Sequence, residues 1–122
     1  MRTLLRTTCL LLILSSLAHA RRTALPKPVP PVSAGEVVFS APHSPPEKGE
    51  QFGGFIEAHN TETKELLWRV RVYDIENGDE GPRYNFIMTL SYDKTHEVLV
   101  LADEHGRIYV LNPATRKVTE IE

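Results

Sequence analysis

The sequence predicts an all-β fold, a small antiparallel meander that forms a two-layer sandwich or a small barrel. Beyond Gly49, apolar residues alternate with polar residues in short runs, which is the period of a half-buried strand. Short segments rich in Gly, Asn and Asp separate these runs and supply the turns of an antiparallel sheet. The 122 residues allow one domain, and no amphipathic helical pattern of useful length follows the N-terminal segment.

The clearest predicted strand covers residues 66–73. One of its faces carries Leu66, Trp68, Val70 and Val72, and the other carries Leu67, Arg69, Arg71 and Tyr73. Further strands are expected over 35–40, 52–58, 84–92, 97–102, 107–111 and 117–121. One face of the strand over 84–92 is expected to carry Tyr84, Phe86, Met88, Leu90 and Tyr92.

The segment 98–101 constrains the architecture, because its four residues, Val-Leu-Val-Leu, are all apolar. A strand of this kind is apolar on both faces, so both of its sides need a cover. One sheet alone cannot provide that. Either the chain folds back as a second layer, or a partner supplies one.

The N-terminus is typical of a secretory signal peptide over residues 1–20. Arg2 and Arg6 precede a short apolar segment, and Ala18-His19-Ala20 has the small-x-small pattern that signal peptidase cleaves. The apolar segment is shorter than the ~18 residues that span a bilayer, which makes an uncleaved anchor the weaker alternative. The protein is therefore expected to be secreted or periplasmic, without a membrane span after cleavage. Cleavage removes Cys9, the only cysteine, so no disulfide is expected.

A proline-rich tether is predicted over residues 21–48, ahead of a β domain over 49–122. Seven of the nine prolines lie between Leu25 and Glu47. Proline fixes φ and removes a backbone donor, which disfavours a central strand or a helix.

Two segments of the chain form an internal sequence repeat. Residues 54–66 can be laid over residues 106–118, and the aligned pairs are Gly54 with Gly106, Ile56 with Ile108, Asn60 with Asn112, Thr63 with Thr115, and Leu66 with Val118. Each segment has the pattern of a hairpin, with a glycine at its entry, an alternating strand and an Asx-type turn.

Both segments resemble the outer hairpin of a blade in the pyrroloquinoline-quinone-type (quinoprotein-like) β-propellers. Residues of the first copy that match the blade pattern are Gly54, Ala58, Asn60, Thr63, Leu67 and Trp68. The resemblance implies one propeller-like blade plus an extra hairpin. A complete propeller needs at least about four blades of four strands, and this chain is too short for that. The quinone site lies at the hub of a complete ring, so no cofactor is carried over.

Catalytic and metal-ligating patterns are absent from the sequence. The histidines that follow the predicted signal, His43, His59, His96 and His105, have no i, i+4 spacing and no cysteine partner, so no metal site is predicted. The serines lack a glycine elbow. One enzymatic alternative, a small secreted hydrolase or metal-dependent enzyme, would use His96, Asp103 and His105.

The predicted function is an exported, non-catalytic binding or assembly module that presents a β-sheet face to a protein partner; an inhibitor fits the same description. The expected contact residues are Arg69, Arg71 and Tyr73, because exposed Arg and Tyr on a rigid sheet make binding hot spots. A self-assembling, blade-like structural domain is a further alternative. With 14 Lys and Arg against 16 Asp and Glu, nucleic-acid binding is not expected.

Overall fold

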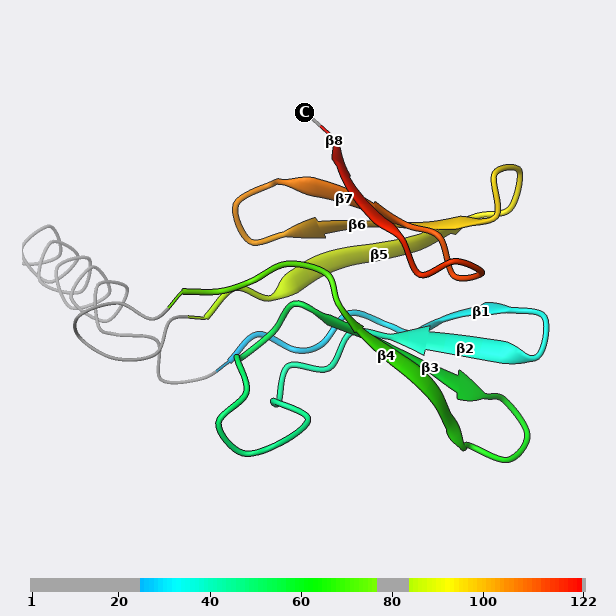
Figure 1. Cartoon of the computed structure of the whole chain (residues 1–122), viewed down its shortest axis with the longest axis horizontal. Coiled ribbons are helices and arrows are strands. Elements are labelled where there is room, and N and C mark those ends of the chain that lie inside the picture. The colour runs from blue at the N-terminus through cyan, green and yellow to red at the C-terminus, as the bar shows by residue number, and fades with distance from the viewer. Residues whose placement is uncertain (1–24, 77–83, 122) are drawn as a thin grey trace, which may run out of the picture.

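Residues 25–76 and 84–121 are described by the computed structural model of the chain, and they form two four-stranded antiparallel sheets (Figure 1). The first sheet contains β1 (Val32–Ala34), β2 (Val37–Ser40), β3 (Phe55–Asn60) and β4 (Leu66–Arg71), paired in that order. The second contains β5 (Ile87–Asp93), β6 (Val98–Asp103), β7 (Ile108–Leu111) and β8 (Val118–Ile121), also paired in order. The predicted all-β meander in two layers is confirmed, and neither sheet closes into a barrel.

The first sheet begins with a strand that the sequence did not predict. β2 matches the strand expected over 35–40, whereas β1 was not expected. Both lie inside the segment 21–48 that was expected to be a tether, and they belong to one sheet with β3. The physical reason is that residues 32–40 are free of proline, and Gly35, with a φ of 63°, allows a tight turn between the two strands. The predicted signal peptide and most of the predicted loop over 76–83 lie outside the described residues.

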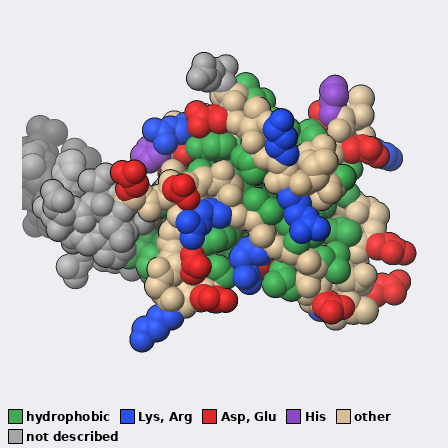
Figure 2. Space-filling model, in the orientation of Figure 1, with side chains coloured by type: hydrophobic (Ala, Val, Ile, Leu, Met, Phe, Trp, Pro, Cys, Tyr) green, Lys and Arg blue, Asp and Glu red, His purple; other side chains and the backbone are tan. Residues whose placement is uncertain are grey.

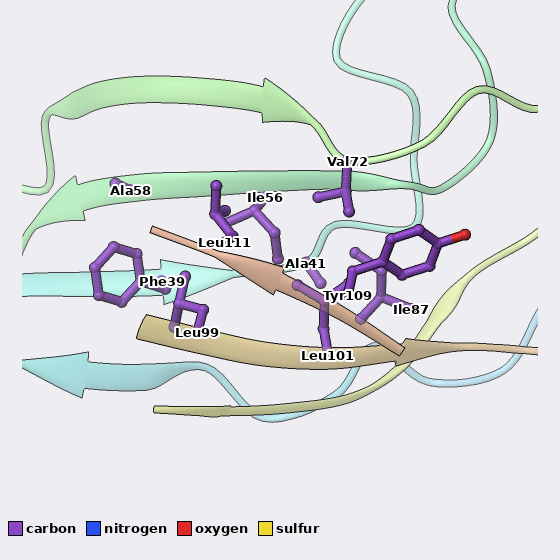
Figure 3. Close-up of a cluster of buried hydrophobic side chains, with 10 residues drawn as sticks. All are labelled: Phe39, Ala41, Ile56, Ala58, Val72, Ile87, Leu99, Leu101, Tyr109 and Leu111. Atoms are coloured by element: carbon purple, nitrogen blue, oxygen red, sulfur yellow. The ribbon is translucent and has the colours of Figure 1, made fainter. Parts of the chain in front are cut away.

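The core fills the space between the two sheets, with side chains from both pointing toward each other (Figure 3). Its buried members are Phe39, Ala41, Ile56, Ala58, Val72, Ile87, Leu99, Leu101, Tyr109 and Leu111. Antiparallel pairing fixes which residues reach it, because side chains alternate along every strand. β6 illustrates this, since Leu99 and Leu101 are fully buried while Val98 and Val100 point away and are half-buried.

One turn geometry joins β3 to β4 and β7 to β8. In the first turn the side-chain oxygen of Asn60 accepts a hydrogen bond from the Thr63 backbone N–H at 3.0 Å; in the second, that of Asn112 accepts one from Thr115 at 3.2 Å. The residue after each threonine takes a positive φ, of 66° and 64°. The two hairpins that the sequence aligned therefore share their local structure.

Two irregularities in the pairing change the faces that alternation predicts. A register shift between Ile87 and Thr89 interrupts the β5–β6 pairing, and it leaves Met88 40% exposed instead of on the inward face. A second shift, between Ala58 and His59, interrupts the β3–β4 pairing, and Leu66 opposite it is 41% exposed.

Candidate interaction surfaces

Two of the predicted contact residues, Arg69 and Arg71, lie together on the outer face of the first sheet. Arg69 Nε is 2.8 Å from Glu57 Oε2 across the β3–β4 pair. Arg71 Nη2 is 2.8 Å from Glu50 Oε2, and its Nη1 is 3.2 Å from Asp74 Oδ1. Both guanidinium groups are therefore already paired with carboxylates of the same chain.

The carboxylates that pair with Arg71 also stabilise its charged form. Hydrogen bonds to Asp74 and Glu50 raise the pKa of Arg71 above its ordinary value. The same guanidinium carbon lies 5.7 Å from the centre of the Phe55 ring, within cation–π range. A ligand binding here would have to compete with these contacts.

The third predicted contact residue, Tyr73, does not share that face. Regular pairing of β4 ends at Arg71, so the alternation that would have pointed Tyr73 outward no longer applies. Its ring stacks on Tyr109 with the centroids 5.1 Å apart, and its hydroxyl donates to the Asn85 carbonyl at 2.7 Å. Burial raises the pKa of Tyr73 above its ordinary value. Tyr73 is a packing residue between the sheets.

A buried polar network lies at the Tyr73 end of the sandwich. Asp103 is 3% exposed, and its Oδ2 accepts a hydrogen bond from Asn85 Nδ2 at 3.0 Å. Its Oδ1 accepts the backbone N–H groups of His105 and Arg107, each at 2.9 Å. Burial alone would raise the pKa of Asp103, but these hydrogen bonds to the carboxylate outweigh it and lower the pKa. A carboxylate held ionised and fully engaged is a structural group and a poor general base.

The residues of the enzymatic alternative are not assembled into one site. His96 and His105 flank opposite ends of β6, which at ~3.3 Å per residue separates them by roughly 20 Å. His96 instead pairs with Asp93, with Nδ1 2.7 Å from Oδ2, in an exposed turn. The region described by the structure contains no group of three or more His, Cys, Asp or Glu residues arranged to hold a metal ion.

His43 also has a structural role. It is buried, its ring stacks on Phe86 at 4.3 Å, and its Nδ1 donates to the Pro26 carbonyl at 2.8 Å. This bond anchors the segment that precedes β1.

An open cavity of about 600 Å³ lies at the same end of the sandwich, with Tyr84, His105 and Arg107 in its lining. No described residue of that lining is a Ser, Thr or Cys nucleophile.

The outer face of the second sheet differs in kind from that of the first. Alternation and register place Val98, Val100 and Ala102 of β6, Ile108 and Val110 of β7, and Thr119 and Ile121 of β8 on this side. We call these seven residues the Val100 face. Ile108 and Ile121 are 41% and 49% exposed, so much of the face is in contact with solvent. None of the seven side chains is charged, but β5 continues the same side of the sheet with Thr89, Ser91 and Asp93, which the register sets opposite Ala102, Val100 and Val98.

Figure 2 shows one side of the molecule, on which Lys and Arg side chains are intermixed with Asp and Glu side chains. The sequence indicated part of the Val100 face, because 98–101 is apolar on both sides. It did not indicate that β7 and β8 extend the face, since that depends on the register that sets Ile108 opposite Ile121.

Comparisons with family models, with curated proteins and with solved structures found no match to this chain. Across residues 25–76 and 84–121, no helix is long and apolar enough to cross a membrane.

Proposed function

We propose that the protein is an exported, non-catalytic binding or assembly module whose contact surface is the Val100 face. The observation that carries the proposal is the apolar part of this sheet face, on β6 to β8, which the chain's own core leaves uncovered. The largest contiguous apolar patch on the surface of a soluble protein is often an interaction site.

The proposal moves the contact surface away from the predicted residues Arg69, Arg71 and Tyr73. Binding at the outer face of the first sheet would desolvate the Arg69–Glu57 pair, and desolvation offsets much of what a new contact contributes. Covering the Val100 face removes apolar side chains from water without separating any ion pair. The free energy of binding therefore favours the second sheet.

The non-catalytic part of the proposal is supported by the positions of the titratable groups. Asp103 is committed to three hydrogen bonds, and His96 is far from His105. Neither arrangement places a base beside a nucleophile, which acid–base and covalent catalysis both need.

The test is site-specific photo-crosslinking in cells that express the full-length chain. A photoreactive amino acid replaces Thr119, an exposed residue of the Val100 face, and the matched control replaces Leu67, which is 47% exposed in the first sheet. We expect covalent adducts of higher mass from position 119 and few from position 67. Equal yields from both positions, or no adduct from position 119, would contradict the proposal.

A further inference from the structure

We propose that the proline-rich segment over residues 25–31 is a second contact surface, which binds a partner domain whose groove is acidic and lined by aromatic side chains. Grooves of this kind recognise polyproline II helices. The inference goes beyond the proposed function, because it does not involve the Val100 face. Three observations carry it: the conformation of the segment, the way the sandwich holds it, and the side chains that it leaves exposed.

The sequence restricts this segment to the polyproline II conformation. Four of its seven residues are proline: Pro26, Pro28, Pro30 and Pro31. Proline fixes φ at about −65°, and a residue that precedes a proline is held in an extended or polyproline II geometry. Every residue from 25 to 31 is a proline or precedes one. The segment accordingly follows an extended path to β1, at the blue start of the described chain (Figure 1).

Burial along the segment has the three-residue period of that helix. Pro26, Val29 and Val32 are half-buried, whereas the two residues between each pair are exposed. A polyproline II helix has three residues per turn, so these three side chains lie along one side of it. Val29 and Val32 pack against the core cluster. One side of the helix therefore faces the sandwich, and the other two sides face solvent.

The sandwich holds the segment at both ends. At its N-terminal end, the Nδ1 of buried His43 donates to the Pro26 carbonyl at 2.8 Å. At its C-terminal end, Val32 pairs with Phe39 as the first residue of β1. A ligand that is already ordered loses little conformational entropy when it binds, and this raises its affinity. A segment that served only as a spacer would gain nothing from being fixed along the domain.

The exposed sides of the helix form a ridge of four residues, Lys27, Pro28, Pro30 and Pro31, which we call the proline ridge. Pro28 and Pro31 are three residues apart and so lie on the same side of the helix. Prolines at this spacing dock into grooves lined by aromatic side chains. Lys27 is the only charged residue between positions 25 and 35, so a carboxylate beside the groove would complement the ridge.

The lack of backbone donors decides between the two common ways of binding an extended segment. Addition of the segment to a sheet edge needs backbone N–H groups, but Pro28, Pro30 and Pro31 offer only carbonyl acceptors. Recognition must then come from the proline rings. Residues 27–31 span only ~12 Å at ~3.1 Å per residue, so the contact is small and the complex should be weak and rapidly reversible.

Photo-crosslinking beside the ridge tests the inference in cells that express the full-length chain. The photoreactive amino acid replaces Ser33, which is exposed, lies two residues after the ridge and is not a proline. We expect an adduct with another protein, in which the crosslinked peptide carries aromatic residues together with Asp or Glu. The double variant Pro28→Ala, Pro31→Ala should lower the adduct yield at least about tenfold, and Lys27→Glu should lower it as well.

The matched control is the double variant Pro45→Ala, Pro46→Ala, which removes two prolines outside the ridge and should leave the yield unchanged. A synthetic peptide of residues 25–34 provides a second readout in an extract of the same cells. In excess, this peptide should suppress the adduct. The same peptide with Pro28→Ala and Pro31→Ala should not suppress it.

Four results would overturn the inference: no adduct from position 33, an adduct that survives Pro28→Ala with Pro31→Ala, an adduct lost equally in the control variant, or an adduct with a second copy of this chain. Failure of the proposed function is a separate result, because adducts from position 119 should persist when the ridge is altered. Circular dichroism checks that the sheets of each variant are intact. If the double ridge variant does not fold, Lys27→Glu, which keeps every proline, decides the outcome.

Discussion

Substitution of Asp103 tests how much the buried hydrogen-bond network at the Tyr73 end of the sandwich contributes to stability. Asp103→Asn keeps the shape of the side chain but removes its charge and one acceptor. If the new amide oxygen accepts the backbone N–H groups of His105 and Arg107, the amide nitrogen faces Asn85 Nδ2, a donor against a donor. Turning the Asn85 amide around would instead lose its bond from the Glu104 backbone N–H, now 3.2 Å long.

The expected cost of this substitution is therefore one charge-assisted hydrogen bond together with a donor left unpaired in the interior. Hydrogen bonds to charged groups contribute about 1.5–3 kcal/mol, so Asp103→Asn should lower the free energy of unfolding by about 2–3 kcal/mol at pH 7. The side chain is 3% exposed, and water therefore cannot replace the missing partner.

The Asp103 carboxylate should also make the free energy of unfolding depend on pH in the acid range. Burial works against ionisation, but the hydrogen bonds from Asn85, Arg107 and His105 lower the pKa of folded Asp103 below its ordinary 3.8. The contribution of Asp103 is then complete above pH ~4, near the pKa of the unfolded chain, and is lost as the pH falls through the lower pKa of the folded state. Asp103→Asn should remove this part of the acid dependence.

Urea unfolding followed by the fluorescence of Trp68, the only tryptophan, measures both effects at pH 7 and at pH 3. Asp93→Asn is the matched control, because Asp93 sits in an exposed turn where asparagine can accept the same backbone bonds, as Asn60 and Asn112 do. It should cost less than Asp103→Asn. Equal losses for the two variants, or an unchanged acid response in Asp103→Asn, would refute the reasoning.

Two further pairs of variants test the packing by the same unfolding measurement. Leu101→Ala should cost about 2–5 kcal/mol because Leu101 is fully buried. Val100→Ala, on the outer face, should cost clearly less, and a loss as large as that of Leu101→Ala would contradict the assigned faces. Gly53→Ala should cost about 1–3 kcal/mol, because φ is 101° and a Cβ would lie 2.5 Å from the Asn85 carbonyl oxygen. Gly35→Ala also has a positive φ but meets no atom within 4 Å, so a cost as high as that of Gly53→Ala would be inconsistent with this contact.

Most of the fold followed from local patterns in the sequence. Alternation identified β3, β4 and β5 to β8 to within a few residues, and the Asn-based turns between them were visible as polar segments. β1 was missed because Val32–Ala34 is only three residues long and directly follows a proline run, so no alternation could be counted. Its strand conformation depends on pairing with β2, a tertiary contact.

The candidate surfaces were predictable only in part. The apolar pattern of 98–101 indicated a strand that needs cover on both sides, and this led to the Val100 face. The position of Tyr73 was not predictable, because alternation no longer sets direction two residues past the end of β4. The turn of Tyr73 toward Tyr109 depends on the packed sandwich. The exposed position of Met88 likewise follows from a register shift that no local pattern marks.

The most direct test of the central claim is the accessibility of the Val100 face in the protein's working compartment. Thr119→Cys and Leu67→Cys place one new thiol on each sheet of a chain whose only natural cysteine is Cys9. Maleimide labelling of intact cells should be at least about tenfold slower at position 119 than at position 67, with each rate normalised to that of the unfolded chain. The purified protein, separated from its partner, should be labelled fast at position 119. Equal rates at the two positions in cells would contradict the claim that the Val100 face is a contact surface.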